Sequence, residues 1–396
     1  MQTVAISLRS LLARPLATLL NLLLLSLGLA SATLVLQVAS QIEQAFERDV
    51  AGIDLVVGAK GSPLQLILAG VFHLDAPSGN VALADVMALA ASPQVAQMIP
   101  LSLGDSVAGF RVVGTTSAYL QHYRVTLAQG QVWSQPLEAV IGALVARQLG
   151  WAVGAQFVGA HGLAGGGAHH DARPFTVRGV LQPCACVLDR LVMTSLESVW
   201  QVHGKEEHAS DGHPDEREIT LALIRYQSPL SAVSFPRYVN TTTRLQAAAP
   251  ALEITRLLRM LGVGADVLRG FAAVLLLMAA LSVFMALWHA VRERQPDLAM
   301  LRMLGAPPRR LAALVLAEAL WLAMTAGLIG LLAGHGLTML VAKLLAVNQS
   351  LPVQAWQWAS GEGYVLLLGL GVTLCAALLP VWSAYRVDVT QLLNRP

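Results

Sequence analysis

The chain has 396 residues, of which 55% are hydrophobic and only 13% are charged. Soluble globular proteins carry about a quarter charged residues, so this composition favours a membrane protein. The formal net charge of +2 is too small to indicate a nucleic-acid partner. The three cysteines, Cys184, Cys186 and Cys375, are too few for a disulfide framework.

Four stretches are apolar and long enough to cross a membrane, which takes about 20 residues. They are residues 16–39, 271–290, 311–334 and 364–385. The first is longer than the apolar core of a signal peptide, but Ala30-Ser31-Ala32 is similar to a cleavage site, so cleavage is kept as an alternative.

Arginines concentrate in three segments outside the apolar stretches: 1–15, 291–310 and 386–396. Segments rich in arginine next to membrane spans stay in the cytoplasm. We therefore expect both termini inside a bacterial inner membrane, with residues 40–270 and 335–363 on the periplasmic side.

The 230-residue segment 40–270 is large enough to fold as a domain of its own. Residues 41–49 and 251–269 have helical spacing and are predicted as stalks that continue the neighbouring spans. Between them the sequence predicts an α+β domain, with a strand, Gly142 and a helix over residues 139–149. Further predicted elements are a helix at 81–91 and strands at 107–114, 175–181 and 190–194.

The predicted fold is thus a membrane α-helical protein with four transmembrane helices, one before and three after an α+β extracytoplasmic domain on helical stalks. The short N-terminal segment alternates apolar residues with arginines, which predicts an amphipathic helix on the membrane surface. The full division is 1–15 cytoplasmic helix, 16–39 first span, 40–270 periplasmic domain, 271–290 second span, 291–310 cytoplasmic loop, 311–334 third span, 335–363 periplasmic loop, 364–385 fourth span and 386–396 cytoplasmic tail.

Several stretches then resemble the MacB/FtsX superfamily of ABC-transporter permeases. Residues 294–307, RQPDLAMLRMLGAP, are similar to the cytoplasmic loop of that superfamily, and residues 380–393 to its C-terminal ending. Residues 111–119, 129–154 and 175–181 are similar to the MacB-type periplasmic core domain. Together with the order of spans, this resemblance covers nearly the whole chain.

The resemblance implies a permease that has no ATPase of its own and is not an enzyme. The sequence agrees, because it has no G-x-x-x-x-G-K-[ST] phosphate loop and no G-x-S-x-G or H-E-x-x-H motif. The implied partners are a cytoplasmic ABC ATPase dimer, which would bind ATP and Mg²⁺, a second copy or paralogue of the permease, and a periplasmic binding protein or adaptor in the lipid-bound assembly.

The loop 291–310 is the expected site of ATPase coupling, since it carries the family pattern and Ala306-Pro307-Pro308 ends a helix there. The alternative is that its arginines only set the topology. The residues predicted to couple are Asp297, Leu301, Arg302, Leu304 and Gly305.

A second candidate site is rich in histidine and cysteine. Imidazole, thiolate and carboxylate are ligands for Zn²⁺ and similar metals, and polar loops rich in histidine can bind a metal without a preformed site. The alternatives are solvated loops and a disulfide between the two cysteines. The candidate ligands are His161, His169, His170, Cys184, Cys186, His203, His208 and His213.

Three functions are compatible with these features. The first is a permease that couples the ATPase to movement of the periplasmic domain and hands on an envelope substrate, with a metal link. The second is an FtsX-like signalling scaffold that controls a periplasmic partner such as a hydrolase. The third is an unrelated receptor with four spans.

Overall fold

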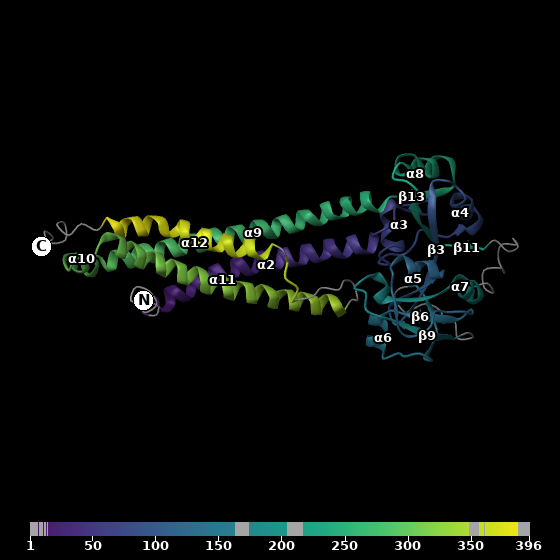
Figure 1. Cartoon of the computed structure of the whole chain (residues 1–396), viewed down its shortest axis with the longest axis horizontal. Helices are drawn as coiled ribbons and strands as arrows, with labels where there is room; N and C mark the ends of the chain where they lie inside the picture. The colour runs from purple at the N-terminus through teal and green to yellow at the C-terminus, as the bar shows by residue number, and fades with distance from the viewer. Residues whose placement is uncertain are drawn as a thin grey trace. The chain divides into compact units, whose positions relative to one another are not determined.

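The computed structural model describes residues 7, 11, 13, 15–162, 174–203, 217–347, 356–359 and 361–386. The described chain forms two compact units, one of residues 1–43 with 260–396 and one of residues 44–259. The predicted helix at 1–15 lies largely outside the described residues. Figure 1 labels the elements along the chain.

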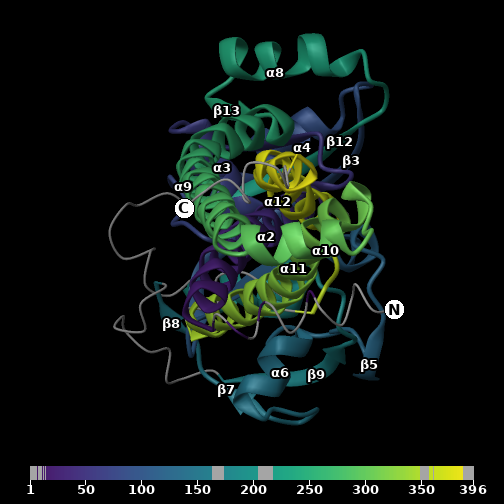
Figure 2. The same ribbon diagram turned by 90° about the vertical axis from the view of Figure 1, so that its left-hand side faces the viewer.

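The helical unit is built from long apolar helices. Figures 1 and 2 both show α2, α9, α11 and α12 side by side in this unit, with the short α10 at one end. Their packed core contains Leu25, Leu29, Leu276, Ala279 and Ala326, and a second cluster forms around Leu298 and Leu311. The helices are α2 (Pro15–Val50), α9 (Pro250–Glu293), α10 (Gln295–Met303), α11 (Pro308–Val347) and α12 (Glu362–Tyr385).

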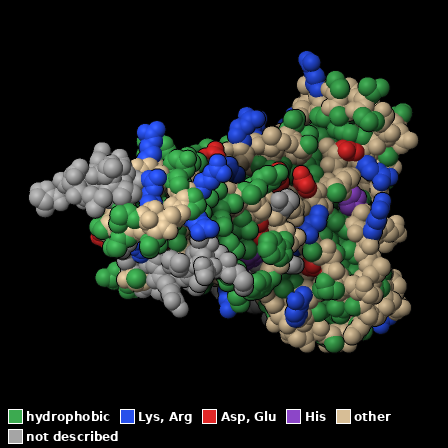
Figure 3. All heavy atoms as spheres, turned by 60° about the vertical axis from the view of Figure 1, so that its left-hand side comes forward, with side chains coloured by type: hydrophobic (Ala, Val, Ile, Leu, Met, Phe, Trp, Pro, Cys, Tyr) green, Lys and Arg blue, Asp and Glu red, His purple; other side chains and the backbone are tan. Residues whose placement is uncertain are grey.

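In the described part of the chain, four helices are long and apolar enough to cross a membrane: Pro15–Val50, Pro250–Glu293, Pro308–Leu344 and Glu362–Tyr385. Each contains one predicted span. Apolar side chains cover much of the outer surface of these helices, as the green atoms in Figure 3 show. Exposed leucines on a helix are the pattern expected for a surface that faces lipid rather than water.

Two segments that were predicted as loops contain helical residues. Helix α11 continues to Val347, into the predicted loop 335–363, because its apolar residues keep helical spacing beyond His335. Helix α10 forms inside the predicted loop 291–310. It starts at Gln295, with Pro296 in its first turn, and is separated from α11 by Gly305 at φ +93° and by Pro307.

The second unit is an α/β domain around an eleven-stranded sheet within the described residues. The strand order is β13-β1-β12-β3-β4-β10-β6-β9-β5, with β7 paired to β9, β8 paired to β3, and a separate pair of β11 with β2. The strands are β1 (Leu55–Ala59), β2 (Val81–Ala82), β3 (Val95–Val107), β4 (Phe110–Thr115), β5 (Leu127–Gly130), β6 (Glu138–Ile141), β7 (Gln156–Phe157), β8 (Ala160–His161), β9 (Phe175–Leu181), β10 (Leu191–Ser195), β11 (Glu218–Ile219), β12 (Leu221–Tyr226) and β13 (Leu245–Ala248).

Short helices cover this sheet, and two separate apolar cores form on it. One core joins β1, β12 and β13 to α4 and α8 around Phe235, and the other joins β4, β6, β9 and β10 to α6 around Phe175. The helices are α3 (Pro63–Gly70), α4 (Leu83–Ala90), α5 (Ser117–His122), α6 (Ala143–Leu149), α7 (Leu196–His203), α8 (Ser231–Thr242) and the 3-10 helix η1 (Val187–Arg190).

Local sequence explains several of these elements. Strand β9 alternates buried and half-buried residues, which is the period of a strand with one face on the core. Gly142 separates β6 from α6, and a Cβ at that position would lie 2.2 Å from the carbonyl oxygen of Leu188. Only glycine therefore allows η1 to pack against this turn.

Candidate functional site

Helix α10 contains three of the predicted coupling residues, Asp297, Leu301 and Arg302, and the other two, Leu304 and Gly305, directly follow it. Its inner face holds Leu298 and Ala299, which are buried against the core that includes Leu311 and Val315. The packing fixes α10 at the end of the helical unit, where it connects α9 to α11 (Figure 2).

The outer face of α10 is apolar and exposed. Leu304 is 85% exposed, and Met300, Leu301 and Met303 are about half-exposed. An exposed apolar group on a short helix is typical of a surface that binds another protein. Arg302 is half-buried and already engaged within the chain. Asp297 lies in α10, but its side chain is outside the described residues.

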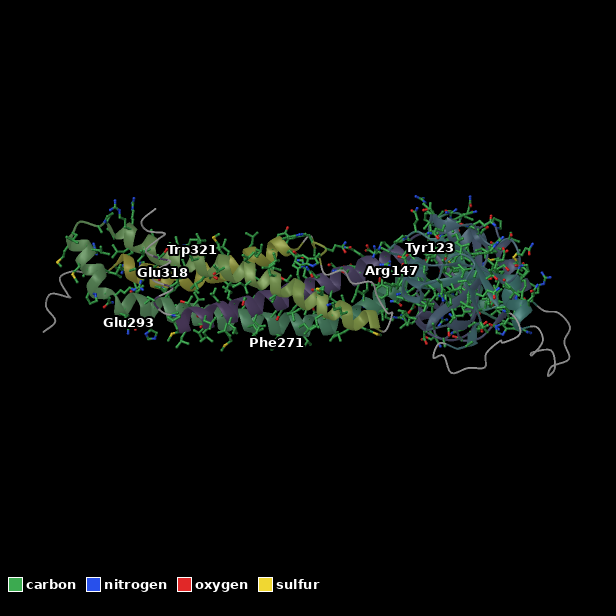
Figure 4. The ribbon with its side chains drawn as sticks, turned by 90° about the horizontal axis from the view of Figure 1, so that it is seen from below. Tyr123, Arg147, Phe271, Glu293, Glu318 and Trp321 are labelled. Carbon is green, nitrogen blue, oxygen red and sulfur yellow. A yellow bond between two sulfur atoms is a disulfide. The ribbon has the colours of Figure 1, made fainter. Side chains whose placement is uncertain are left out.

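An ion pair ties the start of α10 to α11. Arg294, the N-cap of α10, places Nη1 3.1 Å from Oε1 of Glu318. Glu318 is buried and lies within the helical unit, as Figure 4 shows. Because a buried carboxylate needs a partner, this pair links the position of α10 to that of α11.

A second polar cluster joins three helices of the same unit. Gln37 Nε2 donates to Oε1 of Glu362 at 2.8 Å and lies 2.8 Å from Nδ1 of His335. Nε2 of His335 is 3.3 Å from Oε2 of Glu362, and the backbone N–H of Ala359 donates to Oε1 of Glu362. All three side chains are buried. They hold α2, α11 and α12 together by hydrogen bonds, and Trp356 stacks on the imidazole.

The structure brings together only part of the predicted metal site. Cys184 and Cys186 form a disulfide, so in this state their sulfurs are not thiolate ligands. His169, His170, His208 and His213 lie outside the described residues, as does the side chain of His161. In the described ranges, no group of three or more His, Cys, Asp or Glu side chains is placed to bind a metal ion.

One of the predicted ligands, His203, has a partner in the structure that was not predicted. Nε2 of His203 lies 3.1 Å from Oδ2 of Asp105, and both side chains are mostly buried. Asp105 faces His161 in the register of β3 with β8. The sequence analysis missed Asp105, because nothing in the linear spacing connects it to histidines 56 and 98 positions away.

The sequence analysis also missed a group of buried ionisable side chains in the α/β unit. Burial raises the pKa of Asp49 to about 6, against the opposing effect of the Arg190 charge. Burial also lowers the pKa of His73 and raises those of Tyr119 and Tyr123. Nε2 of His73 is 3.0 Å from the Tyr119 hydroxyl, and Figure 4 labels Tyr123 within this unit. These residues are far apart in the sequence and form no recognisable motif.

The four apolar helices and the α/β unit fit a membrane protein with an extracytoplasmic domain. Two family descriptions match it: "MacB-like periplasmic core domain" over residues 18–234 and "FtsX-like permease C-terminal" over residues 269–389. The chain therefore belongs to the MacB/FtsX superfamily, as its sequence motifs predicted.

Two solved structures are similar to about half of this chain at low sequence identity. The periplasmic region of MacB from Actinobacillus actinomycetemcomitans is 11% identical, with a TM-score of 0.35, over 52% of this chain and 95% of that one. The extracellular domain of the transporter YknZ from Gram-positive bacteria is 13% identical, with a TM-score of 0.31, over 49% and 98%. The comparison with curated proteins found no match.

Proposed function

We propose that this chain is the permease subunit of an ABC transporter, and that α10 is the surface on which a separate cytoplasmic ATPase docks. The observation that carries the proposal is the two-sided character of α10. Its inner face is anchored by Leu298 and Ala299, while Met300, Leu301, Met303 and Leu304 leave an apolar outer face exposed. Family membership supports the partner class.

In this proposal ATP-driven movement reaches the periplasmic domain through α2 and α9. Both helices contain an apolar stretch and extend into the α/β unit, α2 to Val50 and α9 from Pro250. One span then precedes the domain and three follow it, in an inner membrane with both termini in the cytoplasm. Two permease copies, or one copy and a paralogue, form the working assembly.

The composition of the spans supports mechanical coupling rather than a polar path through the bilayer. Across residues 16–39, 271–290, 311–334 and 364–385, Glu318 is the single Asp, Glu, Lys or Arg in the sequence, and Glu362 lies just before the fourth of these stretches. The carboxylate of Glu318 is paired with Arg294. Transport pathways through a bilayer usually contain several ionisable groups. The envelope substrate is therefore moved or handed on by the periplasmic domain, with a binding protein or adaptor as the receiving partner.

The test is ATPase stimulation by the purified chain. Capture of the full-length protein first identifies its ATPase, and Leu304→Ser, Leu301→Ser, Arg302→Ala and Asp297→Asn are then assayed. We expect stimulation to fall by about tenfold for the leucine variants, since exposed apolar residues at the centre of an interface contribute most of its binding energy. Leu230→Ser, at an equally exposed leucine of the α/β unit, serves as the control. Normal stimulation in all four α10 variants would overturn the proposal.

The metal link is a separate part of the proposal. The contact of Asp105 with His203, and the register that sets β8 at His161 beside Asp105, support a Zn²⁺-type site at this end of β3. The full-length protein in detergent is titrated with zinc and compared with Asp105→Asn and His203→Ala. We expect the wild type to take up zinc at micromolar concentrations, and the zinc affinity to fall about tenfold or more in either variant. Equal uptake in the wild type and both variants would contradict a site at these residues.

The FtsX-like scaffold is the alternative use of the same machinery. A hydrolase, rather than a binding protein or adaptor, among the captured periplasmic partners would favour it. Both functions share the ATPase surface on α10, so the stimulation assay tests their common part.

A further inference from the structure

The disulfide between Cys184 and Cys186 closes a tight turn between β9 and η1. The two sulfurs bracket Ala185, whose φ is +53°. This left-handed region is disfavoured for an L-residue other than glycine, because its Cβ comes too close to the following carbonyl oxygen. The closed ring holds Ala185 there, so opening the ring would free this residue to return to the ordinary region of negative φ.

Backbone donors of the turn bind a carboxylate within it. The N–H groups of Cys184 and Ala185 donate to the two carboxylate oxygens of Asp189, at 3.0 and 2.8 Å. Sγ of Cys184 lies 3.5 Å from Oδ1 of Asp189. This oxygen is therefore placed to accept a hydrogen bond from a thiol at Cys184, which supports a reduced form of the turn.

The N–H of Cys186 donates to Sγ of Cys184 at 3.2 Å, and the donor that follows it reaches a different element. The N–H of Val187 donates to Oδ1 of Asp49 at 2.8 Å, and Asp49 is the penultimate residue of α2. The Tyr123 hydroxyl donates to the backbone carbonyl of Asp49 at 2.7 Å. We call Asp49, Tyr123 and Val187 the helix-end clamp.

The far side of the turn holds α2 as well. Arg190, the last residue of η1, donates from Nη2 to the carbonyl oxygen of Phe72 at 3.0 Å. Phe72 packs edge-on against Phe46 of α2, with ring centroids 4.6 Å apart. The end of α2 is thus contacted directly by Val187 and, through Phe72, indirectly by Arg190; both residues lie in η1, directly after the turn that the disulfide closes.

The turn is accessible to a reductant. Cys184, Ala185 and Cys186 are half-exposed, and the preceding Gln182 and Pro183 are exposed. Asp49, by contrast, is only 7% exposed, so its hydrogen bond from Val187 is shielded from water. A hydrogen bond to a buried charged group stabilises a fold more than one between neutral groups. Loss of the hydrogen bond between Val187 and Asp49 should therefore be measurable by hydrogen exchange.

We propose that the Cys184–Cys186 disulfide is a thiol–disulfide exchange site whose reduction by a dithiol protein releases the helix-end clamp on α2. A reductant thiolate attacks one sulfur, the S–S bond breaks, and the other cysteine leaves as a thiolate that takes up a proton. The second reductant thiolate then attacks the reductant sulfur of the mixed disulfide, and the cysteine that was attacked first leaves as a thiolate that takes up the second proton. Two electrons and two protons pass to Cys184 and Cys186, and the reductant becomes a disulfide.

In this proposal, the oxidation state of Cys184 and Cys186 decides whether Val187 keeps its hydrogen bond to Asp49 at the end of α2. With the ring closed, Val187 is aimed at Asp49. With the ring open, Ala185 relaxes and the N–H of Val187 loses its fixed direction. The reaction needs only partial exposure of the sulfurs, since exposed disulfides are the ones that exchange readily.

The experiment uses the full-length protein in detergent with Cys375→Ser, which removes the exposed free thiol. Dithiothreitol is the probe, alkylation with mass spectrometry counts the new thiols, and hydrogen exchange follows residues 44–50, Val187 and β10. We expect dithiothreitol to yield two thiols and to lower protection of Val187 and residues 44–50 by about tenfold or more. Protection of β10 should stay unchanged.

A second variant tests the same state without a reductant. Cys184→Ser with Cys186→Ser has no ring, so we expect low protection at residues 44–50 whether or not dithiothreitol is present. Three results would overturn the proposal: no thiols formed in the folded protein, thiols formed with unchanged protection at Val187 and residues 44–50, or loss of protection that extends through β10.

Discussion

At the residue scale, Asp49 shows how burial can outweigh favourable partners. The carboxylate accepts a hydrogen bond from Val187 and feels the Arg190 charge, yet its pKa is raised to about 6 because it is withdrawn from water. A buried charge with partial compensation costs stability, whereas the neutral form does not. The residue is thus tuned to titrate above the ordinary range of aspartate.

This pKa predicts a specific pH dependence. Between pH 4 and 6 the folded state binds more protons than the unfolded one, so stability falls as pH rises through this window and stays lower above it. A shift of about two units corresponds to roughly 3 kcal/mol. Asp49→Asn removes the titration, so relative to the wild type it should gain about 2–3 kcal/mol in unfolding free energy from pH 4 to pH 7.

The measurement is hydrogen exchange of the slowest amides of β10 in the full chain at both pH values. Asp85→Asn, at an exposed carboxylate of α4, is the control and should show little change between them. A relative stability of Asp49→Asn that is the same at pH 4 and pH 7 would show that Asp49 has an ordinary pKa.

At the element scale, the side chains of Gln37, His335 and Glu362 connect α2, α11 and α12 by hydrogen bonds, in addition to the apolar packing between these helices. Apolar packing in a bilayer is only weakly selective, because lipid tails are as apolar as leucine. Polar contacts that satisfy one another can therefore decide which helices associate.

Removing the central acceptor should weaken this association. Glu362→Ala leaves two donors without their carboxylate, the buried Nε2 of Gln37 and the partly buried N–H of Ala359, at a cost of about 2–4 kcal/mol. We expect a clear drop in the thermal midpoint of the full-length protein in detergent, and a smaller drop for Glu362→Gln, which keeps an acceptor. Lys343→Ala, at an exposed position of α11, is the control. Equal midpoints for wild type and Glu362→Ala would argue against the cluster as a stabilising contact.

At the scale of the whole molecule, the proposed topology puts α10 and the α/β unit on opposite sides of the membrane. With Cys375→Ser as background, a cysteine at Ser134 of the α/β unit should react with an impermeant maleimide in intact spheroplasts. A cysteine at Met303 of α10 should react only after permeabilisation. Both side chains are exposed, so access to them depends on the membrane rather than on burial. Labelling of Met303→Cys in sealed cells would reverse or refute the orientation.

Much of the fold is predictable from the sequence, because the features that specify it are local. Runs of apolar residues predict long helices, valine-rich alternation predicts β9, and Gly142 predicts the break between β6 and α6. The prediction was less accurate at α11, which continues to Val347, and at α10, where a helix forms in a predicted loop. Helix ends depend on what the neighbouring chain packs against, which periodicity alone does not report.

The candidate sites likewise contain some features that the local sequence predicts and others that depend on long-range contacts. The sequence by itself determined the superfamily, the apolar helices and the segment that contains α10, since these are patterns of neighbouring residues. Only the tertiary structure decided that Asp105 meets His203, that Glu362 meets Gln37, and that Val187 holds Asp49. These partners are 98, 325 and 138 residues apart, and such contacts arise when sheet register and helix packing bring distant segments together.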